Sequence, residues 1–158
     1  MSGLPEIVGR DEFAALVIRT DYEDEAAWRA VVAELERPWG DDGEFDAAVH
    51  LVDDRVWAGA TPDQVREAVR RDEETCVVFL ADGVTMRSAL RPLLALDPVE
   101  EEILDPEFYR ELLDLPREFR TVPAGVHCVH ANLSLANMGF EEYAEAASAE
   151  ADGVYRSF

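Results

Sequence analysis

The chain has 158 residues, of which 48% are hydrophobic, so it has the length of one ordinary domain and enough apolar material for its own core. Its 14 basic residues, all of them arginine, stand against 35 acidic ones and give a formal net charge of −21. This charge excludes nucleic acid and anionic lipid as main partners, because both are negatively charged, whereas it would attract a basic partner. A purely compositional origin, or adaptation to high salt, would give the same acidity.

The cysteines and the N-terminal residues bear on the cellular compartment. Cys76 and Cys128 are too few for a disulfide framework, so both thiols are expected to be free. Residues 1–6 show no basic stretch followed by an apolar run, and no apolar stretch approaches the roughly 20 residues that cross a bilayer. We expect a cytoplasmic protein that folds as a single domain over residues 1–158.

In chain order, the first predicted elements are a strand over residues 14–20 and a helix that ends before Pro38. The strand is a short apolar run, as expected for a strand that is covered on both faces. The helix carries apolar residues at the spacing of one face, and Thr20 or Asp21 is its expected cap. A second strand is predicted over residues 47–52, and two aspartates follow it.

The middle of the chain predicts a helix between two further strands. Thr61 and Gln64 have the spacing of a capping box, and Pro62 stands where a first helical residue is expected. Strands are predicted over residues 76–81 and 92–96. The residues between these two strands indicate at most one helical turn.

The last third of the chain predicts two helices and one strand. Asp105 and Pro106 mark the start of a short helix. A fifth strand is predicted over residues 119–123, and a final helix begins at about Phe140. The apolar tail, residues 154–158, is expected to pack back onto the domain.

Strands that alternate with helices predict a single three-layer α/β sandwich with a mostly parallel, about five-stranded sheet. Nine apolar residues of the first four strands are expected to form its core. They are Val17, Ile18, Val49, Leu51, Val77, Val78, Phe79, Leu93 and Leu94.

Acidic residues follow each of the first four predicted strands. They are Asp21, Asp53, Asp54, Asp82 and Asp97. Because the carboxyl ends of parallel strands meet at one edge, where ligands bind, we expect these carboxylates to gather there. They could bind an arginine or lysine of a partner, or hold Mg²⁺ or Ca²⁺. Alternatively, they are ordinary turn and cap residues.

Several kinds of site are not supported by the motifs present. A phospho-acceptor receiver domain needs a lysine, and the chain has none. Neither a glycine-rich phosphate loop nor a G-x-S-x-G elbow occurs. His127, Cys128 and His130 have metal-ligating side chains, and a Cys–His pair is a second possibility, but at most two of the three converge on one side of a helix or strand. No metal site is therefore predicted.

Asn132 and Asn137 lie in an otherwise apolar run. This pattern indicates either amides that satisfy the backbone of an irregular turn or a loop that contacts a ligand. With residues 16–21 and 152–158, the segment Asn-Leu-x-Leu-Ala-Asn-Met-x-Phe-Glu-Glu resembles a family of small bacterial proteins of unknown function. The resemblance covers most of the chain and implies a self-standing domain, but it implies no activity, cofactor or catalytic residue.

We therefore interpret the chain as a non-enzymatic acidic binding protein that engages a basic protein partner and needs no cofactor. An immunity-type protein, which covers the positive active-site cleft of a toxin, or a regulatory protein would have this size and charge, an analogy at the level of class. The alternative is a small enzyme or ligand sensor that uses Asp21, Asp54, Asp82 and Asp97, with or without a divalent cation. A deep pocket with converging carboxylates would favour the alternative, and a flat acidic surface would favour the partner.

Overall fold

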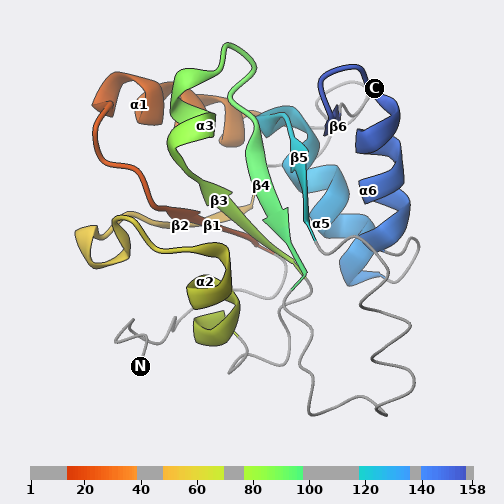
Figure 1. Ribbon diagram of the computed structural model, residues 1–158, viewed down its shortest axis with the longest axis horizontal. Coiled ribbons are helices and arrows are strands. Elements are labelled where there is room, and N and C mark those ends of the chain that lie inside the picture. The colour runs from red at the N-terminus through yellow and green to blue at the C-terminus, as the bar shows by residue number, and fades with distance from the viewer. Residues whose placement is uncertain (1–13, 39–47, 70–76, 98–117, 136–139, 156–158) are drawn as a thin grey trace.

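A computed structural model describes residues 14–38, 48–69, 77–97, 118–135 and 140–155 (Figure 1). Within these residues, six strands form one sheet in the order β2-β1-β3-β4-β5-β6. The strands are β1 (Ala15–Arg19), β2 (Val49–Val52), β3 (Val78–Ala81), β4 (Leu93–Leu96), β5 (Glu118–Thr121) and β6 (Val154–Tyr155). The five predicted strands are all present, and part of the predicted apolar tail forms the sixth.

The sheet is mostly parallel, as the sequence predicts. Strand β1 pairs in parallel with β2 and β3, and β5 pairs in parallel with β6. Strand β4 is antiparallel to both of its neighbours. The connection from β3 to β4, residues 82–92, is short for a parallel crossover, which needs a dozen or more residues, so the chain turns back instead. The strand count of about five was low because the two residues of β6 are too few to show a strand pattern.

The described helices are α1 (Glu25–Leu35), α2 (Pro62–Val69), α3 (Gly83–Arg87), α5 (Val126–Ser134) and α6 (Phe140–Ala149), with short 3₁₀ turns η1 (Arg55–Trp57) and η3 (Pro123–Gly125). The predicted capping box of α2 is present, because Thr61 and Gln64 exchange hydrogen bonds through side chain and backbone. The cap of α1 was placed wrongly. The cap is Asp24, whose side chain accepts a hydrogen bond from the amide of Ala27, and the helix begins at Glu25. The helix predicted from Asp105 lies outside the described residues.

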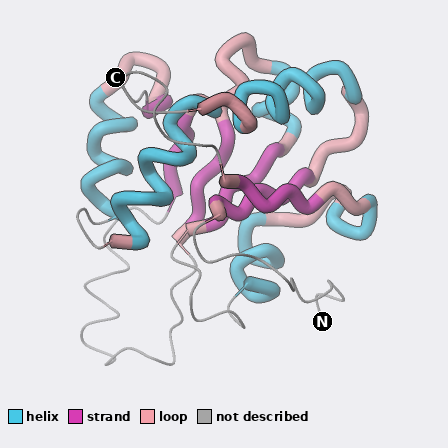
Figure 2. Tube along the Cα trace, turned by 180° about the vertical axis from the view of Figure 1, so that it is seen from behind, coloured by secondary structure: helices cyan, strands magenta, loops and turns pink. Residues whose placement is uncertain are grey.

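Buried side chains form two clusters, one on each face of the sheet. On the first face, α1, α5 and α6 pack against side chains such as Val17 and Phe79. On the second face, α2 packs against side chains such as Ile18 and Leu80. Helices therefore cover both faces of the sheet (Figure 2), which explains why its central strands are apolar throughout rather than alternating.

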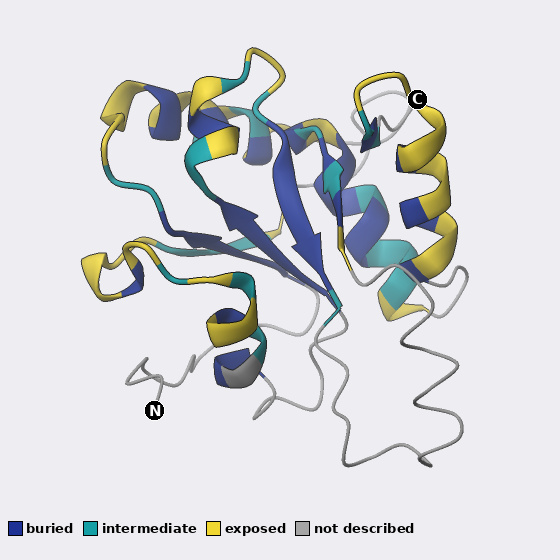
Figure 3. Cartoon of the chain, viewed as in Figure 1, coloured by how far each residue is buried: buried dark blue, intermediate teal, exposed yellow. Residues whose placement is uncertain are grey.

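The burial of the predicted core follows the position of each strand in the sheet. Seven of the nine predicted residues are buried, on β1, β3, β4 and the residue before β3 (Figure 3). Val49 and Leu51 are only partly buried, because β2 lies at the end of the strand order and has a neighbouring strand on one side within the described residues. No helix among the described residues combines the length and the apolar character needed to cross a bilayer.

Candidate functional site

Strands β1, β2 and β3 are parallel, so their carboxyl ends meet at one edge of the sheet, which we call the carboxyl edge. Asp21 follows β1, Asp53 and Asp54 follow β2, and Asp82 follows β3, so the structure brings these four predicted residues to that edge. Asp97 does not join them. It follows β4, which is antiparallel to β3, and therefore lies at the opposite edge.

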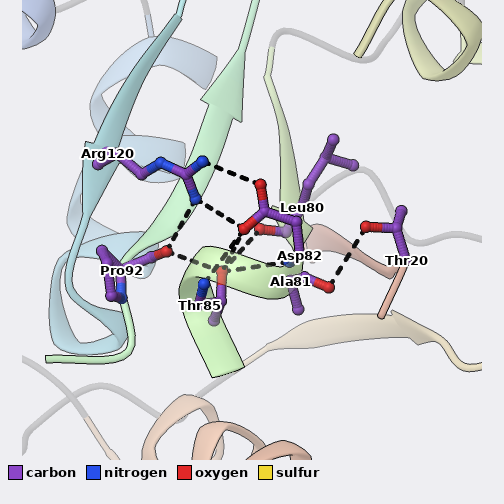
Figure 4. Close-up of polar contacts among 7 residues, drawn as sticks. All are labelled: Thr20, Leu80, Ala81, Asp82, Thr85, Pro92 and Arg120. Atoms are coloured by element: carbon purple, nitrogen blue, oxygen red, sulfur yellow. Dashed lines mark hydrogen bonds and ion pairs between the residues drawn. The ribbon is translucent and has the colours of Figure 1, made fainter. Parts of the chain in front are cut away.

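Asp82 is the most firmly held of these carboxylates (Figure 4). Its two oxygens accept hydrogen bonds from both terminal nitrogens of Arg120 on β5, at 2.8 and 2.9 Å. Arg120 also donates to the carbonyl oxygen of Pro92, just before β4, at 3.2 Å. This bidentate arrangement is the strong form of an arginine–carboxylate pair. Together with the bond to Pro92, it links β3, β4 and β5.

Asp82 also caps α3. Its Oδ1 accepts from the amide of Thr85 at 3.2 Å, and the Thr85 hydroxyl accepts from the amide of Asp82 at 3.2 Å, which completes a capping box. Burial alone would raise the pKa of Asp82. The hydrogen bonds and charge of Arg120, together with the bonds from Thr85, outweigh that effect and lower the pKa below its ordinary value.

Arg19, the last residue of β1, forms the centre of a second cluster at this edge. Its side chain is only 2% exposed, yet its guanidinium group reaches Glu25 at 2.8 Å and Asp53 at 3.3 Å. Its Nε donates to the backbone carbonyl of Asp21 at 2.9 Å. Trp28 completes the cluster by donating its indole N–H to the second oxygen of Asp53 at 3.2 Å. The buried cation is thus balanced by carboxylates from two separate segments.

Aromatic rings cover the same guanidinium group. The carbon at its centre lies 4.2 Å from the ring centroid of Tyr22 and 5.2 Å from that of Trp28. Burial, and next the negative charge of Asp53, raise the pKa of Tyr22 to about 12. The phenol therefore stays neutral near pH 7, and its ring presents an uncharged face to the arginine.

The carboxyl edge is therefore not the row of free carboxylates that the sequence predicted. Sequence reasoning missed Arg19 and Arg120, which form ion pairs with Asp53 and Asp82. The signal for Arg19 was present, because an arginine that ends an apolar strand must find a partner once it is buried. Their partners are 34 and 38 residues away in sequence, so only the folded chain identifies them.

The outer part of the edge remains acidic. We call residues 21–25 and 53–54, which follow β1 and β2, the acidic end. It holds six acids. Arg19 pairs with Glu25 and Asp53, and Arg29 on α1 lies 4.0 Å from Glu25. Asp54 is exposed, and its side chain caps η1 by accepting a hydrogen bond from the amide of Val56. Glu23 is exposed, and the side chain of Asp53 is 46% exposed. The Val56 side chain is 48% exposed, so the acidic end has an apolar residue beside it.

The described residues give no support to a cation site at this edge. Both oxygens of Asp82 are engaged by Arg120, and both oxygens of Asp53 are engaged by Arg19 and Trp28. Nowhere in the described ranges do three histidine, cysteine, aspartate or glutamate side chains lie close enough together to hold a metal ion.

His127, Cys128 and His130 all lie on α5, and their side chains contact neighbouring residues of the fold. His127 is buried, and its Nε2 lies 2.7 Å from the carbonyl oxygen of Leu35, the last residue of α1. Burial lowers the pKa of His127, against the opposite effect of the Leu35 carbonyl, so the neutral ring donates this hydrogen bond near pH 7. The Nε2 of His130 lies 3.4 Å from the hydroxyl of Ser134.

Asn132 lies on α5, next to Cys128 and Tyr143. Its amide nitrogen donates to the Tyr143 hydroxyl oxygen at 2.9 Å and to the backbone carbonyl of Cys128 at 3.1 Å. Tyr143 is almost fully buried, and burial, followed by the neighbouring thiol of Cys128, raises its pKa well above the ordinary value. Asn132 thus fastens α6 to α5. Asn137 lies outside the described residues.

Replacing Asn132 with alanine should lower the free energy of unfolding by about 1–3 kcal/mol, because the buried Tyr143 hydroxyl and the Cys128 carbonyl lose a donor. Tyr143→Phe serves as the matched variant, since it removes the other half of the same hydrogen bond. Chemical denaturation of both single variants and of the double variant measures the coupling between them. If the two effects simply add, the Asn132–Tyr143 bond does not carry the stability that we assign to it.

Overall charge predicts a second stability effect. At a net charge of −21, repulsion among the acidic side chains opposes the compact state, and dissolved salt screens it over about 10 Å at 0.1 M. The melting temperature should therefore rise as NaCl is added from low to moderate concentration, by about 2–4 °C for each kcal/mol of repulsion relieved. Choline chloride should act in the same way, because the effect requires only ionic strength. A melting temperature that stays flat or falls in both salts would contradict the expectation.

Fold and site together define an α/β domain whose carboxyl edge is organised by two arginine–carboxylate clusters. The chain belongs to the family described as a domain of unknown function (DUF6924), whose model matches residues 14–158. The match begins just before β1 and includes every described strand and helix. No curated protein matches the chain.

Proposed function

We propose that this protein is a non-enzymatic binding protein that engages a basic protein partner through the acidic end of its carboxyl edge. The observation that carries the proposal is the distribution of charge there. Arg19 pairs with Glu25 and Asp53, while Glu23 and Asp54 keep their carboxylates in solvent. Carboxylates on a rigid support, free to accept from arginine or lysine, suit the recognition of a basic surface.

The surface around these acids has a composition that suits an interface. The exposed Val56 lies on η1, two residues after Asp54 and next to Arg55, so charged residues precede an apolar side chain. Specific interfaces commonly combine an apolar centre with a polar rim. The backbone of this region is also fixed, because the amide of Gly59 donates to the carbonyl of Thr20 at 2.9 Å and ties the segment after β2 to the end of β1.

The enzyme alternative is supported less well. It needs carboxylates that are free to hold a cation or to exchange a proton, and Asp82 is committed to Arg120 and α3. Arginines pair with Glu25, Asp53 and Asp82, while Glu23 and Asp54 face solvent. This distribution of charge fits binding better than catalysis. Inhibition of a basic enzyme, as immunity-type proteins do, and regulation of a basic protein are the two roles that this surface would suit.

The proposal is tested by affinity capture from cells that express the protein naturally, with a matched pair of charge variants. The variant Glu23→Gln/Asp54→Asn removes two charges from the acidic end, and asparagine keeps the capping capacity of Asp54. The control Glu141→Gln/Glu145→Gln removes two exposed charges from α6, on the other side of the molecule (Figure 1). We expect the wild type and the control to retain the same basic protein and the acidic-end variant to lose most of it. Equal retention by all three proteins would overturn the proposal.

A further inference from the structure

Strand β2 has an open outer edge within the described part of the chain. It stands at one end of the strand order and pairs with β1 over all four of its residues. The strand at the other end, β6, has only two residues and lies against α6. An edge strand presents unpaired N–H and C=O groups, which are a template for another strand.

The register shows which backbone groups of β2 face outward. The amide of Ala15 donates to the carbonyl of Ala48 at 2.9 Å, so Ala48 faces β1. Because alternate residues of a strand direct their backbone groups to opposite sides, His50 and Val52 also face β1. The N–H and C=O groups of Val49 and Leu51 then point away from the sheet, while their side chains pack on the α1 face.

Strand β2 lacks most of the features that protect edge strands from pairing. Its sequence, Val-His-Leu-Val, contains no proline, glycine, lysine or other permanently charged residue, and its register with β1 runs without a bulge. Natural edge strands usually carry such features because an open edge invites association. Its short length limits pairing to a few residues, which suits a segment of a partner rather than a broad sheet.

The charge around β2 specifies the occupant. The strand runs directly into Asp53 and Asp54 of the acidic end, and the whole chain carries −21. A second copy would bring another −21 alongside, so self-pairing is opposed. An extended segment that carries arginine or lysine is attracted, and its backbone matches the outward groups of Val49 and Leu51.

We infer that an extended basic segment of a protein partner adds as a strand to the outer edge of β2, with its charges beside the acidic end. The inference rests on the proposed function and specifies how the partner binds. Main-chain hydrogen bonds to Val49 and Leu51 supply the affinity, and the acids select a basic sequence.

The test uses two synthetic peptides with the full-length, isotopically labelled protein. One is a seven-residue peptide of alternating lysine and valine with blocked ends; the other has the same sequence and charge, but every backbone amide is N-methylated. We expect the first peptide to slow amide hydrogen exchange at Val49 and Leu51 by about tenfold, when its free concentration is ten times its Kd. His50 and Val52, already bonded to β1, should change much less. The methylated peptide should give no added protection.

Variants of Val49 test the outward N–H group itself. Val49→Pro removes it at the first residue of the strand, where proline is tolerated, and Val49→Thr keeps it. Val49→Pro should weaken binding of the unmethylated peptide severalfold, and Val49→Thr should bind like the wild type. Melting temperatures show whether the proline variant is folded; if it is not, the amide protection in the wild type decides alone.

The outcomes separate this inference from the proposed function. Equal binding of the two peptides would mean that charge alone attracts them, which overturns strand addition and leaves the basic partner in place. Binding of neither peptide, even at low salt, would overturn strand addition and weaken the charge argument as well. Concentration-dependent self-association that protects the same two amides without any peptide would identify a second copy as the occupant and overturn the inference.

Discussion

Replacing Asp82 with alanine is expected to lower the free energy of unfolding by about 3 kcal/mol. Two contributions combine in this value: loss of a helix cap, about 1 kcal/mol, and loss of charge-assisted hydrogen bonds, about 1.5–3 kcal/mol. Arg120, whose side chain is only 23% exposed, would be left without its carboxylate partner. The strands β3, β4 and β5 meet at this pair, so we expect the whole domain to unfold more readily.

Asp82→Asn separates the two contributions. Asparagine is as good a cap as aspartate, so this variant should keep α3 and lose only the charge that pairs with Arg120. Its effect on stability should therefore be smaller than that of alanine. Urea denaturation at neutral pH measures both variants, and equal effects would show that the charge, not the cap, accounts for the loss.

The acid dependence of stability gives an independent test of the same pair. Because the pKa of Asp82 is lower in the folded state than in the unfolded chain, its contribution is present above the unfolded value and is lost as the pH falls. The wild type should lose stability between about pH 5 and the folded pKa, and Asp82→Asn should lose less over that interval. Parallel acid curves for the two proteins would contradict the lowered pKa.

Arg19→Met should also destabilise the protein by about 3 kcal/mol, the lower end of what breaking a buried ion pair costs. The lower end applies because the partner carboxylates, Glu25 and Asp53, are 57% and 46% exposed and remain hydrated when the arginine is removed. Methionine fills much of the same volume, so the loss reports the polar and cation–π contacts rather than a cavity.

Arg19→Lys is the matched control for this prediction. Lysine restores the positive charge, but it cannot reach Glu25, Asp53 and the Asp21 carbonyl with one planar group, so we expect only partial recovery. Thermal and urea unfolding of the two variants measures the difference. If lysine restores full stability, only the positive charge matters at this position, and the planar guanidinium group with its several N–H donors is not needed.

Local signals in the sequence predicted most of the elements. The apolar runs of β1, β3 and β4 and the Thr61–Gln64 capping box are decided by neighbouring residues, and the structure confirms them. The direction of β4 was not predicted, although the signal was present: the chain between the predicted strands 76–81 and 92–96 is too short for a parallel crossover. That one reversal moved Asp97 to the opposite edge.

The candidate site was predicted only in part, for a related reason. The sequence placed Asp21, Asp53, Asp54 and Asp82 after their strands, and the parallel register brings them to one edge. It did not show that Arg19 and Arg120 would balance two of them, because those pairs join distant segments. The sequence allowed capping as the alternative to binding for these acids, and the structure shows that Asp54 caps η1 and Asp82 caps α3.

Association kinetics with the captured basic protein test the proposed function most directly. The rate constant should be measured for the wild type, for Glu23→Gln/Asp54→Asn and for Glu141→Gln/Glu145→Gln, from about 10 mM to about 200 mM NaCl, where the Debye length falls from about 30 Å to below 10 Å. We predict that the acidic-end variant associates about threefold or more slowly at low salt and shows a flatter salt dependence, while the α6 control follows the wild type. Equal slowing in both variants would mean that only net charge matters, and no slowing in either would mean that the partner binds elsewhere; each result would contradict a binding surface at the acidic end.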